Sequence, residues 1–188
     1  MQLHQYKKLN FGFGILSPEQ NVGAIICTAR SIKNYYPGTP FLCVVPRNAN
    51  PTIVKEIGSI CPVYKGKETI TSLMNTAIRR GHKEWNLLAM EGTTIRSGII
   101  KKYSLFVEEE SDILFPIVME YNRKGEVTEI KNKFPDASIN GTFIHQKTFK
   151  LTGDFSDCES LFESKLWWTA QAMDKGSKFK AILGTKLI

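Results

Sequence analysis

Residues 69–94, TITSLMNTAIRRGHKEWNLLAMEGTT, contain the two patterns that decide the fold. Ile70, Leu73, Met74 and Ala77 recur at helical spacing and Gly81 follows the last turn, which predicts a helix over 69–80. An apolar run over 85–90 then predicts a buried strand. A helix followed by a buried strand is the repeating unit of a parallel sheet covered on both faces.

The same alternation extends in both directions along the chain. Ser17-Pro18-Glu19-Gln20 resembles a helix start, and so does Ser156-Asp157-Cys158-Glu159. Further strands are predicted at 9–16, 41–45, 61–64, 112–116, 139–145 and 179–183, further helices at 17–36, 52–57, 99–107 and 156–174, and a hairpin around 122–125. We therefore predict one α/β domain over 1–188, with a mostly parallel mixed sheet and helices on both faces.

The composition limits the classes of protein and partner. The net charge of +7 favours an anionic partner such as phosphate, and no nucleic-acid-binding motif accompanies it. The four cysteines show no zinc-ligand spacing. No apolar run is long enough to span a membrane, and residues 1–10 lack the apolar core of a signal peptide, so we expect a cytoplasmic protein.

Four stretches, in this order and spacing, resemble the GT-A fold of nucleotide-diphospho-sugar transferases, and in particular the family-2-type glycosyltransferases. They are 28–37 before the strand at 41–45, 74–78 before 84–88, 141–145, and 153–155 followed by 166–170 and 176–179. The resemblance implies a single Rossmann-like GT-A domain, in which about 1–116 bind the nucleotide and about 117–188 face the acceptor. It implies a nucleotide-sugar donor and a hydroxyl acceptor.

The metal-binding motif of that family is incomplete in this chain. Such enzymes carry an Asp-x-Asp-like motif after the fourth strand, where an acid binds a divalent cation that neutralises the leaving diphosphate. Here the sequence is Leu88-Ala89-Met90-Glu91-Gly92, with the single carboxylate of Glu91. Glu91 could help to hold Mg²⁺ or Mn²⁺ if phosphates supply further ligands, or Arg79, Arg80 or Lys83 could replace the charge of the metal.

The resemblance also implies a catalytic base before the helix at 166–170, to deprotonate the acceptor hydroxyl. Asp157, Glu159 and Glu163 are the candidates, and Thr169 stands where the family usually has Arg. The alternative for Glu163 is a solvated carboxylate that pairs with a lysine on the same helix.

Two further groups of residues are candidates for substrate contacts. In the loop after the second strand, Arg47 could pair with phosphate and Asn48 and Asn50 could bind a nucleobase, although Asn beside Pro is also common in turns. On the acceptor side we consider His145 and Trp168, and for both the alternative is a structural role, as a strand-end histidine and as a core aromatic.

Three functions remain open at this stage. The first is an inverting glycosyltransferase. The second is a non-catalytic GT-A-like domain that serves as a structural or interaction module with a protein partner or in an assembly. This hypothesis rests on the missing acidic motif and the missing Arg. The third is a nucleic-acid-binding accessory protein, which rests on the positive charge alone.

Overall fold

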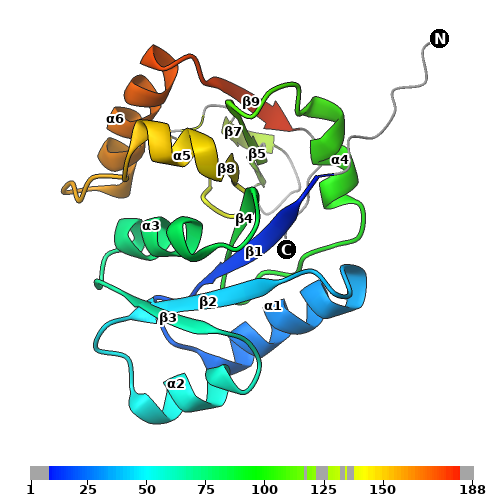
Figure 1. Ribbon diagram of the computed structural model, residues 1–188, viewed down its shortest axis with the longest axis vertical. Helices are drawn as coiled ribbons and strands as arrows, with labels where there is room; N and C mark the ends of the chain where they lie inside the picture. Colours follow the sequence, from blue (N-terminus) through cyan, green and yellow to red (C-terminus); the bar gives the residue numbers. More distant parts are fainter. Residues whose placement is uncertain (1–8, 117, 122–126, 132–133, 135–137, 183–188) are drawn as a thin grey trace.

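The computed structural model describes residues 9–116, 118–121, 127–131, 134 and 138–182 (Figure 1). Its helices are α1 (Val22–Tyr35), α2 (Pro51–Gly58), α3 (Ile70–Arg80), α4 (Ile99–Phe106), α5 (Gln146–Thr152) and α6 (Leu161–Asp174). Its strands are β1 (Phe11–Leu16), β2 (Phe41–Pro46), β3 (Val63–Gly66), β4 (Trp85–Met90), β5 (Asp112–Pro116), β6 (Val118–Tyr121), β7 (Val127–Lys131), β8 (Phe143–His145) and β9 (Lys178–Ile182).

Seven of the strands form one sheet in the order β3-β2-β1-β4-β8-β5-β9. β1 pairs in parallel with β2 and β4, β2 with β3, and β5 with β9, while β8 runs antiparallel between β4 and β5. The sheet is therefore mostly parallel and mixed, as the sequence predicted. β6 and β7 pair separately as an antiparallel ladder, which confirms the strands of the expected hairpin; its turn lies outside the described residues.

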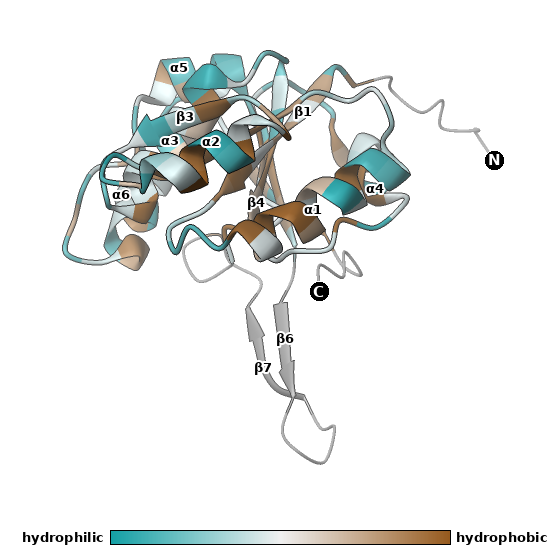
Figure 2. Cartoon of the chain, turned by 90° about the horizontal axis from the view of Figure 1, so that it is seen from below, coloured by the Kyte–Doolittle hydropathy of each residue, from teal (hydrophilic) through white to brown (hydrophobic). Residues whose placement is uncertain are grey.

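Helices cover both faces of the sheet, because alternate strand residues point to opposite sides. On one face, Phe13 and Ile15 of β1 belong to a cluster that includes apolar residues of α1, α2 and α4. On the other face, Leu42 and Val44 of β2 belong to a cluster that includes residues of α3, α5 and α6. Figure 2 shows that α1 carries hydrophobic residues over much of its length. No described helix has both the length and the apolar character that crossing a membrane requires.

The strands β4 and β5 begin and end at the predicted residues, but two helix starts differ. Helix α1 is capped by Asn21, whose side chain accepts from the Ala24 N–H, and not by Ser17. Helix α6 is capped by Ser160, four residues after the predicted Ser156. Helix α5 was not predicted, and β3 lies about two residues further along than expected. Several residues with capping side chains precede both α1 and α6, so composition alone does not determine which of them caps the helix.

Gly14 is required where β1 meets α3. A Cβ at this position would lie 2.9 Å from the Cβ of Ala77 and 3.4 Å from Cδ2 of Leu88. Close approach of strand and helix therefore explains Gly14. At Gly12 the close neighbour is backbone before β2, because a Cβ there would lie 3.1 Å from the Pro40 carbonyl oxygen.

We expect Gly14→Ala to lower the free energy of unfolding by about 1–3 kcal/mol, because α3 must move away from the sheet. Urea unfolding measures this change. Gly58→Ala is the matched control, since a Cβ there meets nothing within 4 Å at the end of α2, and it should leave stability unchanged or raise it by up to about 1 kcal/mol. Equal losses in both variants would contradict the packing argument.

Candidate functional site

The carboxyl ends of the four parallel strands β1 to β4 lie side by side, and we call this side of the sheet the carboxyl edge. Leu16, Pro46, Gly66 and Met90 are their last residues, and the registers place them along the same edge. Open α/β sheets bind ligands outside the carboxyl ends of their strands. The carboxyl edge is therefore the candidate site.

Glu91 lies at the carboxyl edge, directly after β4, and its carboxylate organises the loop between β1 and α1. One oxygen accepts the Ser17 hydroxyl and the Asn21 N–H, and the other accepts the Glu19 N–H, each at 2.8 Å. The same loop contains Gln20, a non-glycine residue with a positive φ of 58°, whose side chain accepts from the Asn50 N–H at 3.2 Å. Glu91 thus stabilises the start of α1.

A divalent cation does not fit these protein groups by themselves. Both oxygens of Glu91 already accept hydrogen bonds from the loop. Within the described part of the chain, no three His, Cys, Asp or Glu side chains gather closely enough to hold a metal ion. We therefore derive no step through a metal.

The loop after β2 brings Arg47, Asn48 and Asn50 to the same edge. Arg47 and Asn48 are exposed, and the Lys65 ammonium donates to the Arg47 carbonyl at 3.4 Å. Asn50 caps α2, because its side-chain oxygen accepts the Thr52 N–H at 2.9 Å. The structural alternative is supported for Asn50, whereas Arg47 and Asn48 present their side chains to solvent.

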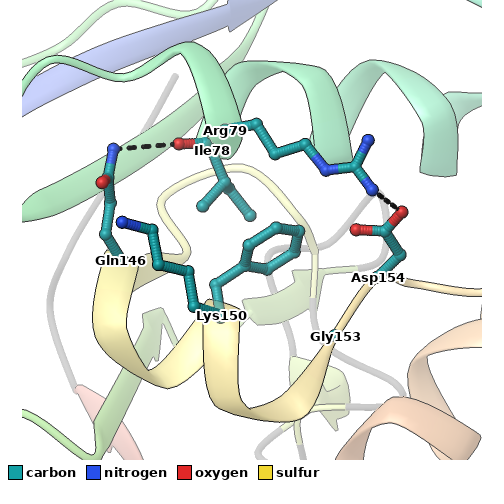
Figure 3. Close-up of a pocket in the computed structure, with 7 residues that line it drawn as sticks. Ile78, Arg79, Gln146, Lys150, Gly153 and Asp154 are labelled. Carbon is teal, nitrogen blue, oxygen red and sulfur yellow. Dashed lines mark hydrogen bonds and ion pairs between the residues drawn. The ribbon is translucent and has the colours of Figure 1, made fainter.

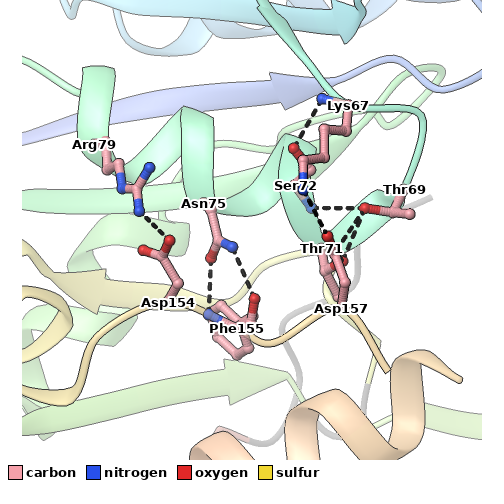
Figure 4. A network of polar contacts seen from close by, with 9 residues as sticks. All are labelled: Lys67, Thr69, Thr71, Ser72, Asn75, Arg79, Asp154, Phe155 and Asp157. Atoms are coloured by element: carbon pink, nitrogen blue, oxygen red, sulfur yellow. Dashed lines mark hydrogen bonds and ion pairs between the residues drawn. The ribbon is translucent and has the colours of Figure 1, made fainter. Parts of the chain in front are cut away.

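Asp157 also lies near the carboxyl edge, where it joins the loop before α6 to the start of α3 (Figure 4). Its carboxylate accepts the hydroxyls of Thr71 at 2.7 Å and Thr69 at 2.8 Å and pairs with Lys67 at 3.4 Å. The hydrogen bonds from Thr71, Thr69 and Lys67 hold the pKa of Asp157 below its ordinary value. A lowered pKa makes a carboxylate a weaker general base, so Asp157 is better suited to a structural role.

The other two candidate bases, Glu163 and Glu159, differ in whether their position shows a structural role. Glu163 is the third residue of α6, and its side chain accepts from the Ser160 N–H while the Ser160 hydroxyl accepts from the Glu163 N–H. This capping box supports a structural role for Glu163. Glu159 is exposed on the loop just before α6.

Arg79 and Arg80 lie at the opposite edge, away from the other donor-site candidates, and the acceptor-side candidate His145 lies at that edge too. The arginines end α3, which returns toward the start of β4, and His145 pairs with Trp85, the first residue of that strand. Arg79 forms an ion pair with Asp154 beside a pocket of about 260 Å³ (Figure 3), and the Arg80 guanidinium lies 5.4 Å from the Tyr64 ring centroid.

His145 and Trp168 are both buried, which supports the structural alternative for each of them. His145 is 6% exposed, and its Nδ1 accepts the Lys147 N–H at 3.1 Å, which caps α5. Trp168 is 1% exposed, and its ring stacks on Phe155 with centroids 4.4 Å apart. The exposed member of the tryptophan pair is Trp167.

Sequence reasoning missed a second polar cluster beside Glu91. The Asn140 side-chain oxygen accepts the Met90 N–H and the Thr93 hydroxyl, each at 3.0 Å, and thereby ties the segment before β8 to the end of β4. Gly141 follows with a φ of 85°. The Asn-Gly pair was the available signal, because this dipeptide marks a turn with left-handed backbone.

Comparison with solved structures identifies the fold. The crystal structure of S. aureus TarS 1-349, a glycosyltransferase, matches with a TM-score of 0.62 at 13% sequence identity. The chain has a glycosyltransferase-like fold. The match covers 94% of this chain and 59% of the TarS chain, so this chain spans less than two thirds of the TarS chain. No family model matches the sequence, and neither does a curated protein.

Proposed function

We propose that this domain binds a nucleoside-diphosphate sugar at the carboxyl edge of β1, β2 and β4 and transfers the sugar to a hydroxyl acceptor, as a GT-A-like glycosyltransferase. The observation that carries the proposal is the position of Arg47 and Asn48. They are exposed at the carboxyl edge of a glycosyltransferase-like sheet, beside the loop that Glu91 and Gln20 organise.

The chemistry proposed for this site relies on positive side chains. Transfer leaves negative charge on the departing diphosphate, and cations placed nearby stabilise that charge. Arg47 follows β2, and Lys65 and Lys67 lie at the end of β3, so all three are near the edge where the diphosphate would lie. Arg79 and Arg80 do not stabilise the diphosphate in this proposal, because they lie at the opposite edge.

The acceptor hydroxyl needs a base, and Glu159 is the one we propose. Asp157 and Glu163 hold structural hydrogen bonds, whereas Glu159 is exposed in the loop between them. A base there would take the proton of the hydroxyl as its oxygen attacks the anomeric carbon and the bond to the diphosphate breaks.

A second candidate function is a non-catalytic domain that keeps the fold as an interaction module. The observation that favours it is the use of Glu91. In this chain the one carboxylate at the position of the metal motif accepts three hydrogen bonds from the loop between β1 and α1, and so stabilises the protein without a ligand.

Calorimetric titration with UDP, GDP, CDP and dTDP, each with and without Mn²⁺, separates the two functions. We expect one nucleotide to bind, and Arg47→Ala to weaken that binding at least about tenfold, or ~1.4 kcal/mol, because a cation near the phosphates is lost. Arg79→Ala is the matched control and should leave the affinity unchanged.

The outcomes have distinct meanings. Binding that needs Mn²⁺ would show that phosphates complete a metal site with Glu91. Binding without Mn²⁺ supports charge stabilisation by the side chains. If none of the four nucleotides binds at millimolar concentration, the transferase proposal fails and the interaction module is favoured.

A further inference from the structure

The outward face of α6 carries four large apolar side chains. Phe162, Leu166, Trp167 and Met173 are 46%, 48%, 63% and 60% exposed. The opposite face is buried through Ser164, Lys165, Trp168 and Ala172. In both Figure 1 and Figure 2, α6 lies at an outer edge of the molecule. The helix therefore carries large apolar side chains on its outer side, where a surface helix usually carries polar ones.

The apolar side chains form a stripe along the helix. At about 100° per residue, Phe162, Met173, Leu166 and Ala170 fall within an arc of about 80°, with Trp167 about 60° beyond it. If each large side chain contributes on the order of 100 Å², the patch measures roughly 400 Å², within the range of about 300–600 Å² typical of the largest apolar patch on a monomer, which often serves binding.

The charges along α6 indicate which kind of partner would cover this stripe. The acidic residues Glu159 and Glu163 lie at its start, and the basic residues Lys175 and Lys178 follow its end. A second α6 in antiparallel orientation brings each acidic end beside a basic end, and it also opposes the two helix dipoles favourably. We infer that two copies of this chain pair through α6, antiparallel, about a two-fold axis at Ala170.

The small side chain of Ala170 lets the two helices approach closely at the axis. This arrangement places Trp167 opposite Met173 of the partner subunit, a favourable aromatic–sulfur contact, and Glu163 opposite the basic segment 175–178 of the other copy. A stable standard interface buries about 800 Å² per partner, so a patch of about half that size is expected to give a weak, reversible dimer.

A lipid surface fits the same stripe less well. Glu163 and Asp174 are exposed on the outer side of α6, between the apolar arc and Trp167. Anionic headgroups would repel these carboxylates, and an interfacial helix usually carries lysine and arginine there.

Sedimentation velocity of the full chain, from about 5 to 500 µM, tests the pairing. We expect a reversible monomer–dimer equilibrium. Leu166→Glu and Ala170→Arg should each raise the dissociation constant at least about tenfold, since they place a charge in the interface. Leu105→Glu is the matched control, because Leu105 is also 48% exposed, on α4, and it should leave the dimer intact. Circular dichroism melting of each variant checks that it folds.

Cysteine cross-linking tests the two-fold axis itself. Ala170→Cys, in a background where the non-buried Cys27 and Cys158 are replaced by serine, should form a disulfide-linked dimer on oxidation. A wild-type chain that stays monomeric at 500 µM would overturn the inference, and so would a dimer that survives both α6 variants. Flotation of a monomeric wild type with phosphatidylserine vesicles, lost in Leu166→Glu, would also overturn it in favour of a membrane surface.

Discussion

Trp168→Ala is expected to lower the free energy of unfolding by about 3–5 kcal/mol, the range for removing a buried aromatic side chain. The Trp168 ring is 1% exposed and stacks on Phe155 at an angle of 21°. Its indole N–H donates to the Gly153 carbonyl at 2.8 Å. The substitution leaves a cavity between α6 and the sheet and an unpaired carbonyl, and both effects destabilise the fold.

Trp167→Ala is the control for this prediction, because Trp167 is the neighbouring residue and is 63% exposed. The change in stability should stay below about 0.5 kcal/mol, as for most surface substitutions. Denaturant unfolding at low protein concentration, where the proposed dimer dissociates, measures both variants. Similar losses for the two tryptophans would show that the orientation of α6 is wrong.

Asp112→Asn is expected to lower the free energy of unfolding at pH 7 by about 2–3 kcal/mol, because a buried ion pair loses one charge. Asp112 is fully buried at the start of β5. One of its oxygens accepts the N–H groups of Glu108 at 2.7 Å and Glu109 at 2.9 Å, and the Lys180 ammonium of β9 at 2.9 Å. The carboxylate thus joins the edge strand to the segment before β5.

The effect of Asp112→Asn should depend on pH. Burial by itself raises the pKa of the Asp112 carboxyl, but the hydrogen bonds from Glu109, Lys180 and Glu108 outweigh it and hold the pKa below its ordinary value. A lowered folded-state pKa gives stability that is present above the unfolded pKa of about 3.9 and is lost as the pH falls through the folded value.

The difference between wild type and Asp112→Asn should therefore stay nearly constant from pH 7 to about 4.5 and shrink as the pH falls below about 4. Urea unfolding across this range measures it. Glu109→Gln is the control, because that carboxylate is 59% exposed and pairs with Lys178 at 3.6 Å, and exposed pairs contribute at most about 1 kcal/mol. A difference that stays constant with pH would contradict the role of the ionised form.

The order of the strands and helices could be predicted because it depends on patterns within a few residues. The apolar runs of β4 and β5 and the helical spacing around Leu73 have one interpretation each, and the structure confirms them. Helix starts were less certain: Ser17 and Asn21 are both good caps, and Asn21 is selected because Glu91, 70 residues away, binds its N–H.

The candidate site could be predicted only in part, for a related reason. Arg47 and Arg79 both follow or end predicted elements, and the sequence does not say which edge of the sheet each one reaches. The direction of β2 and of α3 separates them, with Arg47 at the carboxyl edge and Arg79 at the other. Glu91 was predicted as a candidate metal ligand, but its hydrogen-bond partners Ser17 and Glu19 lie more than 70 residues earlier and could not be predicted.

The sequence by itself determined the class of fold, one α/β domain with helices on both faces of a mostly parallel sheet, because period and composition are local properties. Only the tertiary structure decided which tryptophan is buried, which carboxylates are already bound by the protein, and which cations share an edge. Those outcomes depend on contacts between residues far apart in the chain, and such contacts form only when the strands pair and the helices pack on the sheet.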